Sequence, residues 1–118
     1  MNDYQVVAAS SSYRAHSLAH GAATESGDST EGNKHYDGIV KALRSLRELG
    51  KPGEQALLDL IGDSEAWVRC WAATHSLAVN PERARGALEE LATMKGIVAF
   101  SARTVLDEFA KGTLEVPG

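Results

Sequence analysis

Apolar residues recur along most of the chain at the spacing of one face of an α-helix. The clearest segment is 57–77, LLDLIGDSEAWVRCWAATHSL, in which two apolar runs flank a short polar break. Before the break the periodic residues are Leu57, Leu60 and Ile61, and after it they are Val68, Trp71, Ala72 and His75. We expect Asp63 or Ser64 to cap the helix after the break and Glu65 to lie in its first turn. The segment predicts a helical hairpin, a unit that needs neighbours to bury both of its faces.

Two further helices are predicted before this hairpin. The first runs from Asp3 to about Ala23, and its expected packing face consists of Tyr4, Val7, Ser11, Ala15, Leu18 and Ala22. The second spans residues 29–49, and its expected packing stripe consists of Tyr36, Ile39, Val40, Leu43 and Leu46. We expect Gly27 to end the first helix and Asp28, with Glu31 three residues later, to start the second as a capping box.

Glycine and proline mark the remaining breaks. Residues 50–53, Gly-Lys-Pro-Gly, predict a full stop after the second helix. A fifth helix is expected to start at Pro81 with Asn80 as its cap, and Lys95–Gly96 should end it. A sixth runs from Ile97 to about Ala110 and is closed by Lys111–Gly112; its expected inward residues are Val98, Ala102, Val105 and Phe109.

The last two hairpins resemble each other in sequence. Ala56, Leu57 and Leu60 match Ala87, Leu88 and Leu91 at an offset of 31 residues, and Val68, Trp71, Ala73 and Leu77 match Ile97, Phe100, Ala102 and Leu106 at an offset of 29. A period near 30 residues is typical of stacked helical pairs. The predicted fold is therefore all-α, a short right-handed α-solenoid of about three helical hairpins in a single domain over residues 1–112, with a loose tail at residues 113–118.

Composition narrows the class of function. The chain has 118 residues and a net charge of −4, and its pI is about 5.5. It shows no basic cluster of the kind that nucleic-acid binders carry, so DNA binding is disfavoured. The single cysteine excludes an internal disulfide and favours a reducing compartment. Without a secretory signal or a membrane-spanning apolar run, we expect a cytoplasmic protein.

The hairpin at 57–77 resembles a HEAT-like repeat of the short bacterial type (PBS-lyase-type), in a family of unassigned function. The matching residues are Asp63, Val68, Arg69, Ala72, Ala73 and Leu77. The resemblance implies that the alanines let the paired helices approach closely and that Arg69 ties to an acidic residue in or beside the turn, Asp63 or Glu65. It implies structural roles for Asp63 and Arg69, while Trp71 is expected in the core. The third hairpin lacks both the arginine and the acid of the turn, which implies a cap.

Candidate partner-binding residues are one tryptophan and a set of acids. Trp67 lies beside the turn and is either a partner anchor, a role in which tryptophan is over-represented, or a side chain packed on the neighbouring hairpin. The acidic residues are either a patch on the concave side, which would attract a basic partner, or simply solvated helix faces. They are Asp59, Glu65, Glu89, Glu90, Asp107 and Glu108.

Candidate chemistry rests on histidines and the cysteine. His16 and His20 are four residues apart, so their rings share a helix face, and His35 across the turn would complete a three-histidine metal site. The plainer interpretation is that the three are solvated or packed. Cys70 and His75 could form a nucleophilic pair, but on a helix they point in different directions, so a small buried thiol and a core histidine are expected.

Two functions remain open. HEAT-like arrays generally bind other macromolecules, and small bacterial ones often accompany toxins, so the resemblance implies a non-enzymatic protein-binding α-solenoid without cofactor. Its most concrete form is an antitoxin or immunity-type inhibitor of a basic toxin, monomeric or a weak dimer. The alternative is a metal-binding or enzymatic helical module that uses His16, His20 and His35.

Overall fold

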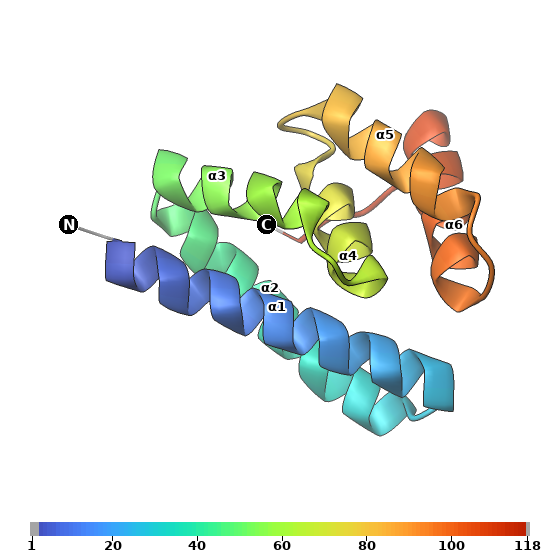
Figure 1. Cartoon of the computed structure of the whole chain (residues 1–118), viewed down its shortest axis with the longest axis horizontal. Coiled ribbons are helices and arrows are strands. Elements are labelled where there is room, and N and C mark those ends of the chain that lie inside the picture. Colours follow the sequence, from blue (N-terminus) through green and yellow to red (C-terminus); the bar gives the residue numbers. More distant parts are fainter. Residues whose placement is uncertain (1–2, 118) are drawn as a thin grey trace. The chain divides into compact units, whose positions relative to one another are not determined.

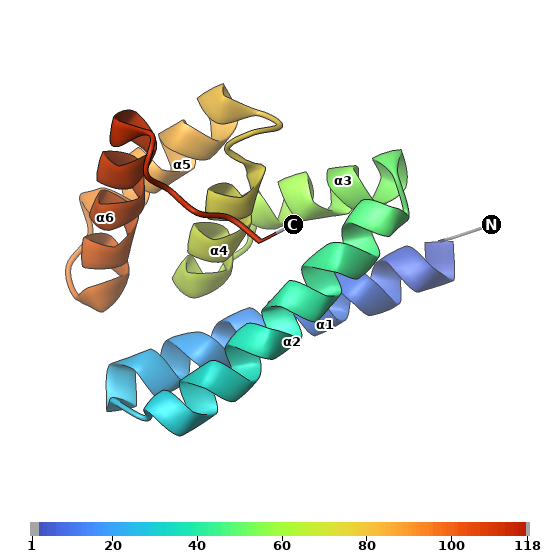
Figure 2. The same cartoon turned by 180° about the vertical axis from the view of Figure 1, so that it is seen from behind.

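The computed structural model describes residues 3–117, and these residues form an all-helical fold without a strand. The helices are α1 (Asp3–Ser26), α2 (Ser29–Glu48), α3 (Lys51–Asp59), the short 3₁₀ turn η1 (Leu60–Gly62), α4 (Ala66–Ser76), α5 (Pro81–Ala92) and α6 (Ile97–Lys111) (Figures 1 and 2). The predicted all-α class is confirmed. Contacts divide the chain into two compact units, Met1–Leu60 and Ile61–Gly118, here called unit 1 and unit 2.

Unit 1 is a long antiparallel pair, α1 and α2, with α3 packed against both helices. The predicted stripe of α2 is largely confirmed, since Ile39, Leu43 and Leu46 are buried. Tyr36, at the start of the stripe, is 38% exposed instead. A central apolar stripe on α2 therefore holds the hairpin together.

The packing face predicted for α1 is wrong. Tyr4 and Val7 are 84% and 63% exposed, and the rest of that face, Ser11, Ala15, Leu18 and Ala22, contains no buried residue. The buried residues of α1 are Ala9, Tyr13, Ser17, Gly21 and Ala23. Four of them repeat at i+4, and their small side chains let α2 approach closely while the Tyr13 ring fills the space. A stripe containing serine and glycine has little hydrophobic contrast, so periodicity selected the wrong face.

The turn between α1 and α2 forms as predicted. Gly27 has a φ of +74°, a left-handed conformation that glycine adopts without steric cost. The Asp28 carboxylate then accepts the Glu31 amide N–H at 3.1 Å and caps α2.

The stop predicted at residues 50–53 is confirmed, since α2 ends at Glu48, but the break is short and the next helix follows almost at once. Gly50 has a φ of +71°, and α3 begins directly after it at Lys51. Pro52 fits in the first turn, where its missing N–H is not needed. Gly53 is buried, and a Cβ placed on it would collide with the backbone carbonyl of Leu46. What appears in the sequence as a breaker is the residue that lets α3 lie against α2.

Unit 2 contains α4, α5 and α6, each packed against the other two. Its core is built from small and branched side chains: Val68, Ala72, Ala73, Leu77, Ala84, Leu88, Leu91, Val98, Ala99 and Ala102. Val105 and Phe109, which were predicted to face inward, are only partly buried. Trp71, expected in the core, is likewise partly exposed.

The segment 57–77 differs from its prediction in two ways. Contacts assign α3 to unit 1 and α4 to unit 2, whereas the prediction placed both helices in one hairpin. The N-cap of α4 is Glu65, without a side-chain cap bond, and neither Asp63 nor Ser64 takes that place. The Asp63 carboxylate instead accepts the Glu65 amide N–H at 2.9 Å, which turns the chain into the helix.

The start of α5 and both ends of α6 match the sequence prediction, while α5 ends at Ala92, before the break predicted at Lys95–Gly96. The Asn80 side chain accepts the Arg83 amide N–H at 3.2 Å, and Pro81 opens α5. Gly96 and Gly112 have φ values of +91° and +73° and bound α6. Residues 113–117 contain no helix, and Gly118 lies outside the described residues.

Candidate functional site

Two histidines meet between the helices of unit 1. The Nδ1 atoms of His16 on α1 and His35 on α2 are 3.0 Å apart in a partly buried place. Their ring centroids are 5.2 Å apart and the rings are tilted by 44°. A Cβ on Gly38 would come within 2.5 Å of three atoms of the His16 ring. The close neighbour of Gly38 is therefore this imidazole.

His20 lies one turn further along α1 and makes different contacts. Its Nδ1 is 3.4 Å from the Thr24 hydroxyl, and its ring centroid is 6.4 Å from that of Tyr36. Burial, and secondly the nearby His35, lower the pKa of His20. Within residues 3–117, no three His, Cys, Asp or Glu side chains are grouped so that they could hold a metal ion. The structure therefore brings two of the three predicted histidines together.

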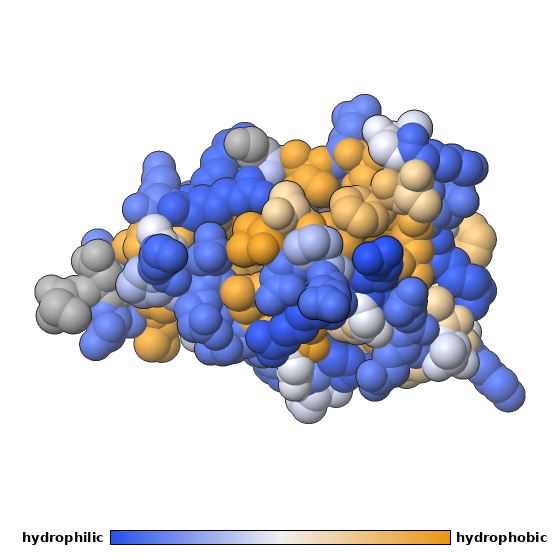
Figure 3. Space-filling model, turned by 90° about the horizontal axis from the view of Figure 1, so that it is seen from above, coloured by the Kyte–Doolittle hydropathy of each residue, from blue (hydrophilic) through white to orange (hydrophobic). Residues whose placement is uncertain are grey.

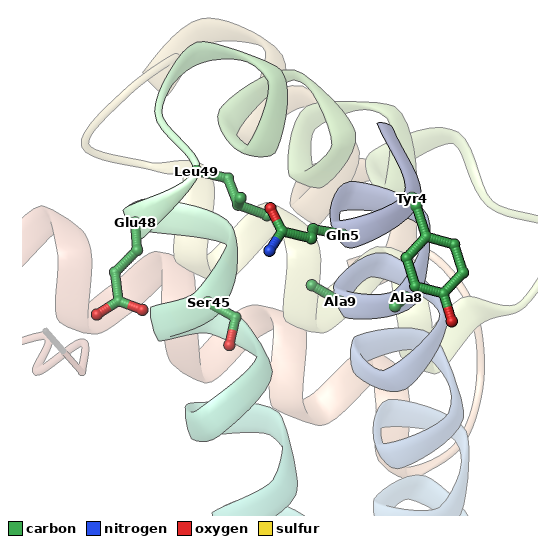
Figure 4. A pocket seen from close by; sticks show the side chains of 7 residues that line it. All are labelled: Tyr4, Gln5, Ala8, Ala9, Ser45, Glu48 and Leu49. Atoms are coloured by element: carbon green, nitrogen blue, oxygen red, sulfur yellow. The ribbon is translucent and has the colours of Figure 1, made fainter. Parts of the chain in front are cut away.

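Unit 1 also carries two surface hollows. The larger, about 430 Å³, lies between the start of α1 and the end of α2 (Figure 4). Its lining residues are Tyr4, Gln5, Ala8, Ala9, Ser45, Glu48 and Leu49. The smaller, about 270 Å³, lies at the α1–α2 turn beside His20. The polar side chains of the larger lining are Tyr4, Gln5, Ser45 and Glu48, and Glu48 is the one that carries a charge.

Most of the acidic residues predicted to bind a partner are exposed to solvent. Glu65, Glu89, Glu90 and Asp107 are exposed, and Glu108 is partly buried. Asp107 forms an ion pair with Lys111 at 2.9 Å, and this bond raises the pKa of Lys111. Asp59 lies in unit 1, where its carboxylate accepts the Gln55 side-chain N–H at 2.8 Å. Trp67 is partly buried.

Sequence reasoning missed an apolar surface in unit 2. Met94, Ile97 and Phe100 are 43%, 39% and 64% exposed, and they follow one another through the α5–α6 connection into α6. We call these three residues the α5–α6 corner. Apolar side chains reach the surface in several places between polar ones (Figure 3). The missed signal was that Ile97 and Phe100, at i and i+3, lie opposite the buried side of α6.

Two arginine side chains in unit 2 donate hydrogen bonds to backbone carbonyls that precede their helices in the chain. Arg69 Nη1 donates to the backbone carbonyl of Asp63 at 2.9 Å, so Arg69 reaches the predicted turn through a main-chain oxygen, whereas the prediction named an acidic side chain. Arg103 Nη1 donates to the carbonyl of Ala92 at the end of α5, also at 2.9 Å. The third hairpin has no arginine at the position that corresponds to Arg69. Its bond to the preceding helix end comes instead from Arg103, one helical turn later.

Cys70 and His75 are buried, as the plain interpretation predicted. Their residual exposures are 5% and 3%, and the His75 ring lies 5.5 Å from that of Trp71. Burial raises the pKa of the Cys70 thiol to about 11, so at neutral pH it is not the thiolate that a nucleophile requires.

Comparison with known proteins gives a likeness of fold. No protein-family model and no curated protein match the chain. Among solved structures, it is similar to the crystal structure of the protein RPA1889 from Rhodopseudomonas palustris CGA009, with 23% identity and a TM-score of 0.83 over 94% of this chain and 93% of that chain. This likeness shows a shared helical fold and says nothing of activity.

None of the described helices has both the length and the apolar character needed to cross a membrane.

Proposed function

We propose that the chain is a HEAT-like helical-repeat protein whose hairpins form a short right-handed solenoid. Three features support this proposal. Helix α1 packs against α2, and α5 packs against α6. The neighbouring alanines Ala72 and Ala73 are fully buried, and Arg69 donates a hydrogen bond to the turn before its helix. Small buried residues at a helix contact allow the close approach that stacked pairs need.

We further propose that the protein binds another protein and is not an enzyme. The observation that carries this proposal is the α5–α6 corner, where Phe100 is 64% exposed one helical turn after Ile97, which is 39% exposed, and Met94 in the connection before α6 is 43% exposed. Leaving a phenylalanine in water costs roughly 1.5–3 kcal/mol relative to burying it. Adjacent exposed apolar side chains are typical of interaction sites, and aromatic residues concentrate binding energy there.

The charge of the chain favours a basic partner. Glu89 and Glu90 on α5 and Asp107 on α6 are exposed, and the net charge of the whole chain is −4. A chain with a net negative charge attracts a basic protein at a distance, while the charged residues next to the corner in sequence, Lys95 and Arg103, are basic and exposed. A basic toxin inhibited by this protein in the cytoplasm is the most concrete partner of this kind.

Affinity capture from a lysate of the source organism tests the proposal, with three baits compared. Phe100→Asp places a charge on the corner, while Val7→Asp places the same charge on an equally exposed residue of α1 (63%, against 64% for Phe100). We expect the wild type and Val7→Asp to capture the same basic protein, and Phe100→Asp to lose it. The double variant Glu89→Lys/Glu90→Lys should weaken capture most strongly at low salt.

Capture that is equal with all three baits would exclude the corner as the contact surface. An acidic captured protein, or capture that salt does not weaken, would contradict the charge argument.

A further inference from the structure

We propose that His16 and His35 bind one divalent transition-metal ion of borderline softness through their Nδ1 atoms. This inference is independent of the protein-binding proposal. It rests on the meeting of two imidazoles from different helices, 19 residues apart in sequence, with their Nδ1 atoms 3.0 Å from each other. The remaining coordination positions of the ion are open to water or to a small ligand.

The separation of the two nitrogens is close to what a metal needs. In four-coordinate zinc with Zn–N bonds of about 2.0–2.1 Å, two ligand nitrogens lie roughly 3.3 Å apart. In the protein alone this 3.0 Å contact is a hydrogen bond, in which one Nδ1 donates its proton and the other accepts it. A bound ion would take the place of that proton, and both rings would turn so that the two Nδ1 lone pairs face the ion. The neutral imidazole with its proton on Nε2 leaves Nδ1 free to coordinate.

The fold fixes the His16 ring in this position. The ring occupies the space over Gly38, where a Cβ would come within 2.5 Å of three ring atoms. Gly38 lies one turn after His35 on the same helix, so it seats the His16 ring beside its partner. Glycine is a poor helix former, and here its missing side chain provides the room for the imidazole. Ligand side chains that the fold holds in position bind a metal ion more tightly than flexible side chains do.

The contacts of His20 limit the site to two protein ligands. Its Nδ1 lies near the Thr24 hydroxyl, and no three potential ligand residues are grouped within residues 3–117. A site with two histidines and open positions suits Cu²⁺, Ni²⁺ and Zn²⁺, with Cu²⁺ bound most tightly. Mg²⁺ and Ca²⁺ prefer oxygen ligands and should not bind there.

Titration of the tag-free protein with Zn²⁺ and Cu²⁺ tests the site. We expect one ion per chain, and a Cu²⁺ electron paramagnetic resonance spectrum with coupling to two imidazole nitrogens. His16→Ala and His35→Ala should each weaken binding at least about tenfold. The matched control is His20→Ala, on the same face one turn away, which should change affinity less than about threefold.

A fourth variant tests whether metal binding depends on the position of the His16 ring, and it removes neither histidine. Gly38→Ala displaces His16 and should also weaken binding, although both histidines remain. Circular dichroism shows whether each variant keeps its helices, and His35→Asn replaces His35→Ala if the latter unfolds. Saturating Zn²⁺ should raise the Tm of the wild type and leave that of the His35 variant unchanged. Absence of binding, binding by His16→Ala or His35→Ala as tight as that of the wild type, or an equal loss in His20→Ala would overturn the proposal.

Discussion

Two glycines in helices of the same chain have opposite structural roles. At Gly53 a Cβ would collide with the backbone carbonyl of Leu46, while at Gly86 in α5 it would meet nothing within 4 Å. We therefore expect Gly53→Ala to destabilise the protein by about 2 kcal/mol or more, because backbone cannot move aside as a side chain can. Gly86→Ala should leave stability unchanged or raise it by up to about 1 kcal/mol. Urea denaturation of both variants measures the difference, and equal stabilities would show that α3 does not lie this close to α2.

The buried thiol gives a second prediction at the same scale. Because Cys70 is 5% exposed and its pKa is raised to about 11, Ellman's reagent at pH 8 should label it only as the protein unfolds. Fast labelling of the native protein, at the rate of a free thiol, would contradict the burial.

The same pKa determines the sign of a pH dependence. The unfolded thiol ionises near pH 9, while the folded thiol keeps its proton up to about pH 11. Between these values the unfolded chain binds fewer protons, so stability falls as pH rises. The contribution of this group is complete below pH 9 and is lost as pH rises through 11. Cys70→Ala should lack this part of the alkaline loss in urea titrations at pH 8.5 and 10.5.

At the scale of elements, α1 shows where periodicity fails. Its buried face is made of alanine, serine, glycine and one tyrosine, so the hydrophobic signal that identified α2 is almost absent. Sequence reasoning followed the apolar side chains Tyr4 and Val7, which the structure places in the solvent. Close helix packing selects small residues, and small residues are not distinguished by hydrophobicity.

Two tyrosines on α1 test which face packs. Tyr13 is fully buried and Tyr4 is 84% exposed. We expect Tyr13→Ala to lose about 3 kcal/mol or more of stability through the cavity it leaves, and Tyr4→Ala to change it by less than about 0.5 kcal/mol. Thermal denaturation followed by circular dichroism compares the two. If Tyr4→Ala were less stable than Tyr13→Ala, the packed face of α1 would be the one that periodicity predicted.

Helix caps were predictable because their chemistry is local. Asn80 accepts the Arg83 amide N–H, as its place before Pro81 indicated. Replacing it with alanine should cost about 1 kcal/mol, while Asn80→Asp retains an acceptor and should cost little. Chemical denaturation measures both, and an equal loss in the two variants would mean that the cap bond contributes nothing.

For the whole molecule, the sequence predicted the helical class, most helix ends and the burial of Cys70 and His75, because each depends on local signals. It did not predict that α3 belongs with α1 and α2, since residues 50–53 look like a stop and only the tertiary contact of Gly53 explains them. The His16–His35 contact depends on the register between two helices, which no pattern within one helix contains. The α5–α6 corner was missed because exposure is a property of the packed molecule.

The central claim is that the α5–α6 corner is the surface with which this protein binds a basic partner protein. Amide hydrogen exchange of the captured complex, compared with the protein alone, tests it most directly. We predict that slowed exchange concentrates at the end of α5 and the first turns of α6, around Met94, Ile97 and Phe100. Protection confined to α1 and α2, with unit 2 unchanged, would contradict the claim.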